Sequence, residues 1–320
     1  MKRDTAIDIM KAIGIMSVMI GHLRTPYVVS SIVYSYHMPL FFLVGGYFYR
    51  PKPDIAGAVR KDFKRLVIPY LFTSLVLASA YAVKAVLGLE DSFHNMFFFL
   101  KGIFWACGSA GQTAMIKGDL SYVGPIWFLL ALFWCKLFYN LLVCYTHHPK
   151  IYAAVIAVIA TLIHYYVIFI PMGITLGASA MMFYLIGHWA KEHNVDRYFI
   201  VACVVCWLIG VSYSKVVMAR CCYGMYPVDV LGACGATMLI YMLSKGLEKT
   251  PLRPVFSWIG VNTLVFLSFH TMDLSFGISQ RIPFSSGYGV QFLGMLAFCS
   301  LMTWACYQIP FTRWIFGLKR

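Results

Sequence analysis

The first apolar run of the chain carries several ionisable side chains. Residues 8–25 read DIMKAIGIMSVMIGHLRT and include Asp8, Lys11 and His22. Histidine is the side chain whose charge ordinarily changes near neutral pH, so it can move protons. Asp8 lies three positions before Lys11, a spacing that allows an ion pair on a helix. Ionisable residues inside a membrane-length segment are functional candidates.

Helical geometry places these residues on one stripe. Lys11 and His22 are eleven positions apart, which is about three helical turns, so they point the same way about 16 Å apart along the axis. Such a stripe should face the bundle interior or a hydrated passage rather than lipid. For each residue alone there is a second interpretation, in which Lys11 extends to the cytoplasmic interface and His22 lies at the outer one.

The composition indicates the environment of that segment. Of 320 residues, 61% are hydrophobic and only 12% are charged. Apolar runs of roughly 20 residues, the length that crosses a bilayer, recur along the chain. We therefore predict an all-α polytopic membrane protein with one integral-membrane domain over residues 1–320 and about ten transmembrane helices. Their expected ranges are 7–25, 29–49, 65–87, 122–145, 151–170, 172–190, 198–215, 227–244, 257–276 and 289–311.

The remaining apolar segment, residues 93–107, is short and contains Lys101, so a re-entrant or interfacial helix is expected there. Residues 88–120 could form a cover over the outer mouth or an ordinary long loop.

The distribution of basic residues predicts the orientation. With ten spans and an internal N-terminus, seventeen Lys and Arg fall in cytoplasmic segments and seven in outer ones. This asymmetry favours cytoplasmic termini, and it accounts for the net charge of +14 without nucleic acid. The start, MKRDTAIDIMKAIG, shows no cleavage site, so the first helix is expected to remain as an anchor. The ten cysteines show no metal-type spacing, and no metal site is expected.

Five segments resemble one known family. Besides Asp8, Lys11 and His22, they are YHMPLFFLVGGYF at 36–48, KRLVIPY at 64–70, PIWFLLALF at 125–133 and WIGVNTLVFLSFH at 258–270. In this order the segments are similar to the acyltransferase-3 family of membrane O-acyltransferases, whose first helix has a basic residue, ten intervening residues and a histidine. Lys11 stands where many members have arginine. The compact, fucose-4-O-acetylase-like form without an added extracytoplasmic domain is the nearest subgroup.

The resemblance implies a reaction. The donor would be cytoplasmic acyl-CoA, with acetyl-CoA expected, and the acceptor a hydroxyl of an extracytoplasmic sugar, glycan or glycolipid. The protein would be a multi-pass protein of a bacterial cytoplasmic membrane. His22 would be a general base or a transient acyl carrier, and direct transfer and the two-step route both stay open. Lys11 and Asp8 would act at the donor end.

Other candidates each have two interpretations. His37 could share a cavity with His22, or satisfy a carbonyl freed by Pro39. A basic cluster could clamp the phosphates of CoA, or could set topology and contact anionic lipid. The cluster consists of Arg60, Lys61, Lys64 and Arg65. Family members often carry Arg-x-x-Arg near here, but this chain has Asp62 three positions before Arg65.

Three further residues are candidates for substrate binding. Trp127 could instead pack in the core or lie in an interfacial belt, and Asn262 could hydrogen-bond between helices. His270 could instead be a histidine at the outer interface.

Two other classes of protein remain open. A secondary transporter or flippase would share the kinked helices and buried ionisable groups, although we find neither two related halves nor many acidic residues at mid-membrane. A haem protein would need facing histidines, for which His22 and His37 are the available pair.

Overall fold

The first two helices pack against each other in opposite directions in the computed structural model of the chain. α1 (Thr5–Gly21) begins where the Asp4 side chain accepts the N–H of Ala6 at 3.0 Å, which satisfies a free donor of the first turn. Gly21 of α1 lies beside Val33 and Tyr34 of α2 (Tyr27–Tyr47), and Gly14 lies beside Leu40 and Phe41. The end of α1 is therefore next to the start of α2.

The structure describes residues 4–87, 92–108, 122–193, 195–213, 215–279 and 287–319. Within these ranges the regular structure is helical, apart from one isolated bridge between Val217 and Cys222. The other elements are α3 (Ile55–Asp62), η1 (Phe63–Val67), α4 (Ile68–Val86), α5 (Ser92–Trp105), η2 (Gly124–Ile126), α6 (Trp127–Tyr145), α7 (Pro149–Tyr166), η3 (Pro171–Gly173), α8 (Ile174–Glu192), α9 (Arg197–Tyr213), η4 (Met218–Arg220), α10 (Tyr226–Leu247), α11 (Arg253–Val261), α12 (Thr263–Phe276), α13 (Tyr288–Gln308) and α14 (Pro310–Phe316).

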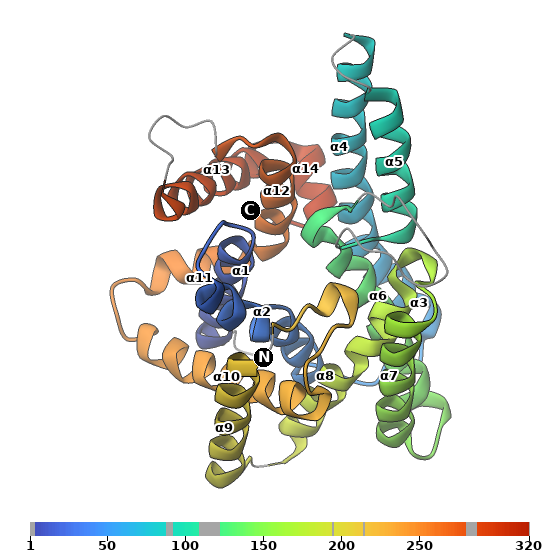
Figure 1. Ribbon diagram of the computed structural model, residues 1–320, viewed down its shortest axis with the longest axis vertical. Coiled ribbons are helices and arrows are strands. Elements are labelled where there is room, and N and C mark those ends of the chain that lie inside the picture. Colours follow the sequence, from blue (N-terminus) through green and yellow to red (C-terminus); the bar gives the residue numbers. More distant parts are fainter. Residues whose placement is uncertain are drawn as a thin grey trace.

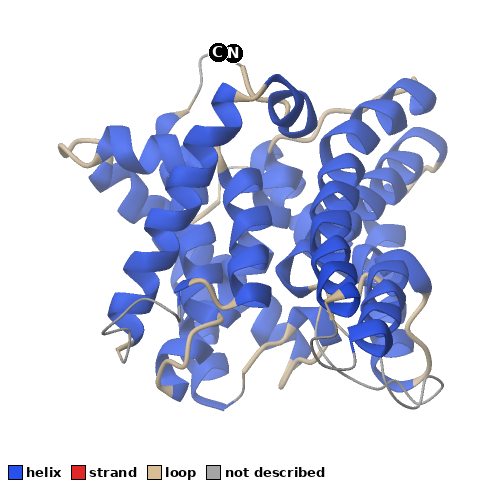
Figure 2. Ribbon diagram, turned by 90° about the horizontal axis from the view of Figure 1, so that it is seen from above, coloured by secondary structure: helices blue, strands red, loops and turns tan. Residues whose placement is uncertain are grey.

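The long helices form one bundle with α1 near its centre (Figure 1). α1 packs against α2, α10, α11 and α12, while α4 and α5 form a pair at one side. Seen from a right angle, many of the helices run in roughly the same direction (Figure 2). Apolar side chains such as Val155, Leu208 and Leu301 are exposed on the outside of this bundle. An outside of this kind suits lipid rather than water, which agrees with a multi-pass membrane protein.

Fewer helices than the ten expected spans are both long enough and apolar enough to cross a membrane. Six helical stretches of the described chain are long and apolar enough to cross a membrane, and the bent pair α11–α12 would make a seventh. Each of the ten expected ranges nevertheless overlaps a helix, so ten spans stay a prediction. The expected short helix at 93–107 corresponds to α5. Its placement in the membrane interface is untested.

The expected span 257–276 is two helices instead of one. α11 and α12 meet at an angle of 76°, with Asn262 between them. The Asn262 side-chain amide donates to the Trp258 carbonyl at 2.8 Å, and its oxygen accepts from the Tyr307 hydroxyl at 2.9 Å. These bonds satisfy polar groups that the break exposes, so a bend is stable in an apolar setting.

The two ends of the bundle hold different residues. The beginning of α1 lies near the end of α2, because Ile7 and Tyr47 line one cavity. η1 and α4 follow in the sequence soon after this end of α2, and α14 packs against both of them. α14 therefore lies at the same end of the bundle. We call this the termini end and the opposite one, which holds His22, the histidine end. Whether the termini end is cytoplasmic stays a prediction.

Glycines bring α2 and α8 into close contact. A Cβ added at Gly46 would lie 1.9 Å from the Tyr184 carbonyl oxygen, and one added at Gly187 would lie 2.0 Å from that of Leu43. Any side chain at these two positions would push the helices apart.

The expected cover at residues 88–120 is only partly described. Residues 88–91 and 109–121 lie outside the described ranges. The described part, α5, packs along α4 and touches η3.

Candidate functional site

Two histidines from opposite ends of the sequence meet at the histidine end. His22 follows the last residue of α1, and Nε2 of His270, on α12, lies 3.4 Å from Nδ1 of His22. His270 is fully buried, whereas His22 keeps part of its surface exposed. His270 therefore lies inside the bundle and not on its surface, and its interpretation as a histidine at the outer interface stays open. His22 lies against the bundle interior and is still accessible to a reactant.

A hydrogen bond to a backbone carbonyl indicates which nitrogen of the His22 ring carries the proton. Nδ1 of His22 lies 2.8 Å from the carbonyl oxygen of Val18. A carbonyl only accepts hydrogen bonds, so Nδ1 carries the proton and Nε2 of the neutral ring keeps its lone pair. His22 therefore presents Nε2 as a base or nucleophile.

His37 belongs to the same cluster through Tyr34. The rings of His37 and Tyr34 are perpendicular with centroids 4.9 Å apart, and the Tyr34 and His22 centroids are 6.4 Å apart. Tyr34 therefore lies near both histidines, and a cavity shared by His37 and His22 stays a prediction.

The alternative role of His37 as partner of a freed carbonyl is wrong in detail. Its Nδ1 bonds the Val33 carbonyl at 2.5 Å, whereas Pro39 lacks the N–H that would reach the carbonyl of Ser35.

Lys11 and Asp8 form the predicted ion pair nearer the termini end. The Lys11 Nζ lies 2.8 Å from a carboxylate oxygen of Asp8, which is buried, and the Lys11 side chain is partly exposed. The expected 16 Å between Lys11 and His22 follows from about eleven rises of 1.5 Å along the continuous α1. A hydrated passage joining the two stays a prediction.

The predicted basic cluster forms a surface at the termini end. Arg60 and Lys61 lie in the last turn of α3, and Lys64 and Arg65 lie in the π-helical turn η1; all four are exposed. The Lys64 Nζ lies 5.5 Å from the centre of the Trp314 ring. The four cations thus lie exposed within six residues of each other, where a polyanionic ligand can reach them.

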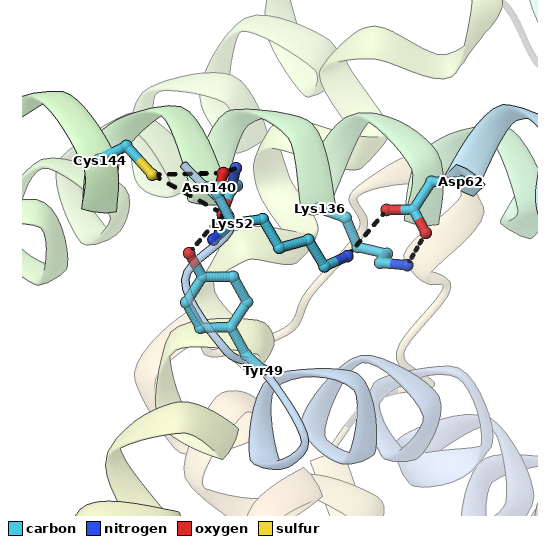
Figure 3. A network of polar contacts seen from close by, with 6 residues as sticks. All are labelled: Tyr49, Lys52, Asp62, Lys136, Asn140 and Cys144. Carbon is cyan, nitrogen blue, oxygen red and sulfur yellow. Dashed lines mark hydrogen bonds and ion pairs between the residues drawn. The ribbon is translucent and has the colours of Figure 1, made fainter. Parts of the chain in front are cut away.

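A buried polar network lies beneath this surface (Figure 3). The Asp62 carboxylate pairs with Lys136 of α6 through one oxygen and with Lys52 through the other, the latter at 3.5 Å. Asn140 accepts from the Lys52 backbone N–H at 3.0 Å and from the Tyr49 hydroxyl at 2.8 Å. Sequence reasoning missed this network, although Lys136 stood out as a lone cation inside a predicted span.

The network encloses a cavity of about 20 Å³, lined by Tyr49, Lys52, Asp62, Lys136 and Asn140 among others. This space is near the size that holds one water molecule. Asp62, which departs from the family's Arg-x-x-Arg pattern, is therefore a residue that ties η1 to α6.

The three residues predicted to bind substrate have different surroundings. Trp127 begins α6 and is buried, which agrees with core packing. It follows η2, which contacts α12, where Gly124 abuts Thr271 next to His270. Asn262 lies eight residues before His270, about 12 Å along α12. Its hydrogen bonds join helices, as one of its two interpretations predicted.

Comparison with known families decides the class of protein. A family model described as an acyltransferase domain, Acyl_transf_3, matches residues 4–310. The chain belongs to the acyltransferase-3 family. No curated protein and no solved structure matches the sequence.

The matched range of the acyltransferase includes both ends of the bundle. It contains the histidine cluster of His22, Tyr34, His37 and His270, and the basic cluster around η1. Membership establishes acyl transfer as the class of reaction. Which residues carry it out is a separate question, which the geometry addresses.

Proposed function

We propose that this acyltransferase moves an acyl group, acetyl in the first instance, from acyl-CoA at the termini end to a sugar hydroxyl at the histidine end. The termini end would face the cytoplasm, and the sugar would belong to an extracytoplasmic glycan or a glycolipid. The observation that carries the proposal is the bond from His22 Nδ1 to the Val18 carbonyl, which leaves Nε2 basic in a half-buried position. Family membership supports the class of reaction.

The chemistry needs one base. Nε2 of His22 takes the proton of the sugar hydroxyl while the hydroxyl oxygen attacks the thioester carbonyl. The new C–O bond forms, the C–S bond breaks, and the departing CoA thiolate takes the proton from the imidazolium. Atoms and charge balance without a further reactant. In the two-step variant, Nε2 attacks the thioester carbonyl and the C–S bond breaks, which leaves an acyl-imidazolium and the CoA thiolate. The sugar hydroxyl then attacks the acyl carbon, the C–N bond breaks, and the thiolate takes the hydroxyl proton.

The positively charged residues at the termini end would bind the donor. The exposed cations Arg60, Lys61, Lys64 and Arg65 suit the phosphates of CoA, because charge-assisted bonds to phosphate are strong. Lys11, fixed by Asp8, lies between this surface and His22 along α1, where it would hold the donor on its way. His37 would help to shape the histidine end.

Replacement of His22 tests the proposal. We expect His22→Ala to lower acetyl-CoA turnover by at least about a hundredfold, since general base catalysis contributes that much. The control is His193→Ala, because Nδ1 of His193 also bonds a carbonyl four residues earlier, that of Trp189 at 3.0 Å, yet lies in an exposed position. Release of free CoA from the purified full chain is the readout, with thermal unfolding as the check on folding.

Two results bear on this proposal directly. Normal turnover in His22→Ala would remove His22 from the mechanism. Intact-mass detection of an acetylated wild-type chain, absent in His22→Ala, would select the two-step variant over direct transfer.

A further inference from the structure

A lysine from outside the predicted sites lies at the histidine cluster. Lys215 follows α9, and its Nζ lies 4.0 Å from the centre of the Tyr34 ring. The Tyr34 ring in turn lies 4.9 Å from that of His37 and 6.4 Å from that of His22, measured between ring centroids. The side chain is partly buried, so the ammonium is placed at the edge of the site rather than free in solvent.

This ammonium lacks an internal counter-charge. None of the ion pairs among the described residues includes Lys215. Asp229 and Asp273, the described carboxylates near this end, are buried and already accept hydrogen bonds, from Met225 N–H and from the N–H and hydroxyl of Ser279. A positive group partly removed from water gains when an anion joins it.

Two arginines add to the positive charge around His22. Arg24 is exposed two residues after His22, and exposed Arg220 acts electrostatically on Tyr34. We call Arg24, Lys215 and Arg220 the cationic mouth. Beneath it, Nδ1 of the fully buried His270 has no hydrogen-bond partner among the described residues. A buried polar atom of this kind beside an accessible histidine indicates that a polar ligand or water completes the site.

We propose that the cationic mouth selects an acceptor that carries a negative charge, with the Lys215 ammonium pairing to a carboxylate or phosphate on the sugar. The pair would hold the sugar ring against Tyr34 and direct a neighbouring hydroxyl to Nε2 of His22. This inference rests on the proposed function for the identity of the site. It adds the chemical class of the acceptor: an acidic sugar or a sugar phosphate, in place of a neutral sugar.

The test uses the full chain in lipid nanodiscs and three small acceptors. They are methyl β-glucoside, the methyl glycoside of glucuronic acid, and glucose 1-phosphate, so the two anionic sugars separate a carboxylate from a phosphate. Two readouts are taken for each sugar: release of CoA from acetyl-CoA, and binding by saturation-transfer NMR without any donor.

The variants separate charge from packing. Lys215→Met keeps the aliphatic stem over Tyr34 and removes the charge, while Lys215→Arg keeps the charge. Lys84→Met is the matched control, because the Lys84 Nζ also lies over a tyrosine, Tyr81, at 5.9 Å. Thermal unfolding of each variant checks that the fold is kept.

The expected result is a charge-dependent preference. Wild-type protein should bind and use at least one anionic sugar about tenfold better than the neutral one, as one charge-assisted bond provides. Lys215→Met should lose this preference through a higher KM for the anionic sugars, while Lys215→Arg and Lys84→Met should keep it. Raising the salt concentration should weaken the wild-type preference.

Several outcomes would overturn the inference. They are equal binding of all three sugars, no binding of any, or an equal fall in turnover on charged and neutral acceptors in Lys215→Met, which would make Lys215 a stabiliser of the transition state. If CoA is released but without dependence on acceptor charge, the proposed function survives and this inference fails. If anionic sugars bind through Lys215 but CoA is never released, the inference survives and the proposed function fails.

Discussion

Nδ1 of His22 has two possible hydrogen-bond partners, one on the backbone and one on the His270 ring. Nδ1–H of His22 points to the Val18 carbonyl at 2.8 Å, and Nε2 of His270 lies 3.4 Å from the same nitrogen. Since that N–H is already a donor, Nε2 of His270 is best placed as a second acceptor. When His22 takes a proton from a hydroxyl, the positive charge on its ring then faces both a carbonyl and a lone pair.

This geometry predicts that His270→Phe lowers turnover without unfolding the protein. Phenylalanine fills the buried volume and removes the unpartnered Nδ1, so the free energy of unfolding should change by less than about 1 kcal/mol. The imidazolium loses an acceptor, so kcat should fall about tenfold. CoA-release kinetics and thermal unfolding measure the two effects. An unchanged kcat would make His270 a packing residue only.

At this scale the sequence predicts residue types better than partners. The Asp8–Lys11 pair was predictable because both residues lie on one helix with fixed spacing. The contact of His22 with His270 was not, since it depends on how α12 packs beside α1 across 248 positions. Lys215 was not predicted as a site residue, because a lysine after the end of a helix is not part of any helical pattern in the sequence.

At the scale of elements, the turn η1 depends on a buried carboxylate. Asp62 ends α3 directly before η1 and reaches Lys136 on α6 and Lys52 before α3. The Asp62 and Lys136 side chains are 10% and 23% exposed. Breaking such a pair leaves a charge in a poorly hydrated place, which costs far more than breaking a pair at the surface.

We therefore expect Asp62→Asn to destabilise the protein by about 3 kcal/mol, as for other buried pairs from which one partner is removed. The double exchange Asp62→Lys with Lys136→Asp should recover part of that loss, because it restores opposite charges. Denaturation in detergent measures both. Glu192→Gln is the control, since its pair with Lys150 is exposed and its loss should cost under about 1 kcal/mol. Equal effects of the two single changes would contradict a structural role for Asp62.

The positions of the helices followed from hydropathy, but the break within 257–276 did not. Apolar residues continue through α11 and α12, so composition is the same on both sides of Asn262. The bend depends on hydrogen bonds from Asn262 to Trp258 and Tyr307, and the second partner lies on another helix. Tertiary contacts of this kind have no signature in a single segment.

At the scale of the whole molecule, the basic cluster and the histidine cluster occupy opposite ends. Such a separation suits a reaction whose donor and acceptor come from different sides of a membrane. The basic cluster would then matter for donor binding and not for chemistry at His22.

Neutralising Lys64 and Arg65 to glutamine should therefore raise KM for acetyl-CoA about tenfold and leave kcat nearly unchanged, because lost phosphate contacts weaken binding. The effect should shrink at high salt and with a donor that lacks the 3′-phosphate. The matched control neutralises Lys245 and Lys249, two exposed lysines at the end of α10. If both double variants behave alike, the basic cluster serves topology or lipid contact instead.

The two ends also predict the topology. α1 begins and α14 lies at the termini end, an arrangement that predicts an even number of crossings. Six spans by length and apolarity, or the ten expected, would put the two termini on the same side, whereas seven would put them on opposite sides. The excess of basic residues in the segments assigned to the termini end favours the cytoplasm.

Fluorescent-protein fusions decide between an even and an odd number of spans. A fluorescent protein that folds only in the cytoplasm should give signal when fused before residue 1 and, separately, after residue 320 of the full chain. A fusion within the loop after α9, at the cationic mouth, should stay dark while alkaline phosphatase at the same place is active. Opposite signals from the two terminal fusions would require an odd number of spans and would contradict the arrangement of α1 and α14. Signal from the α9 fusion would place His22 on the donor side, and the acceptor would then have to be cytoplasmic.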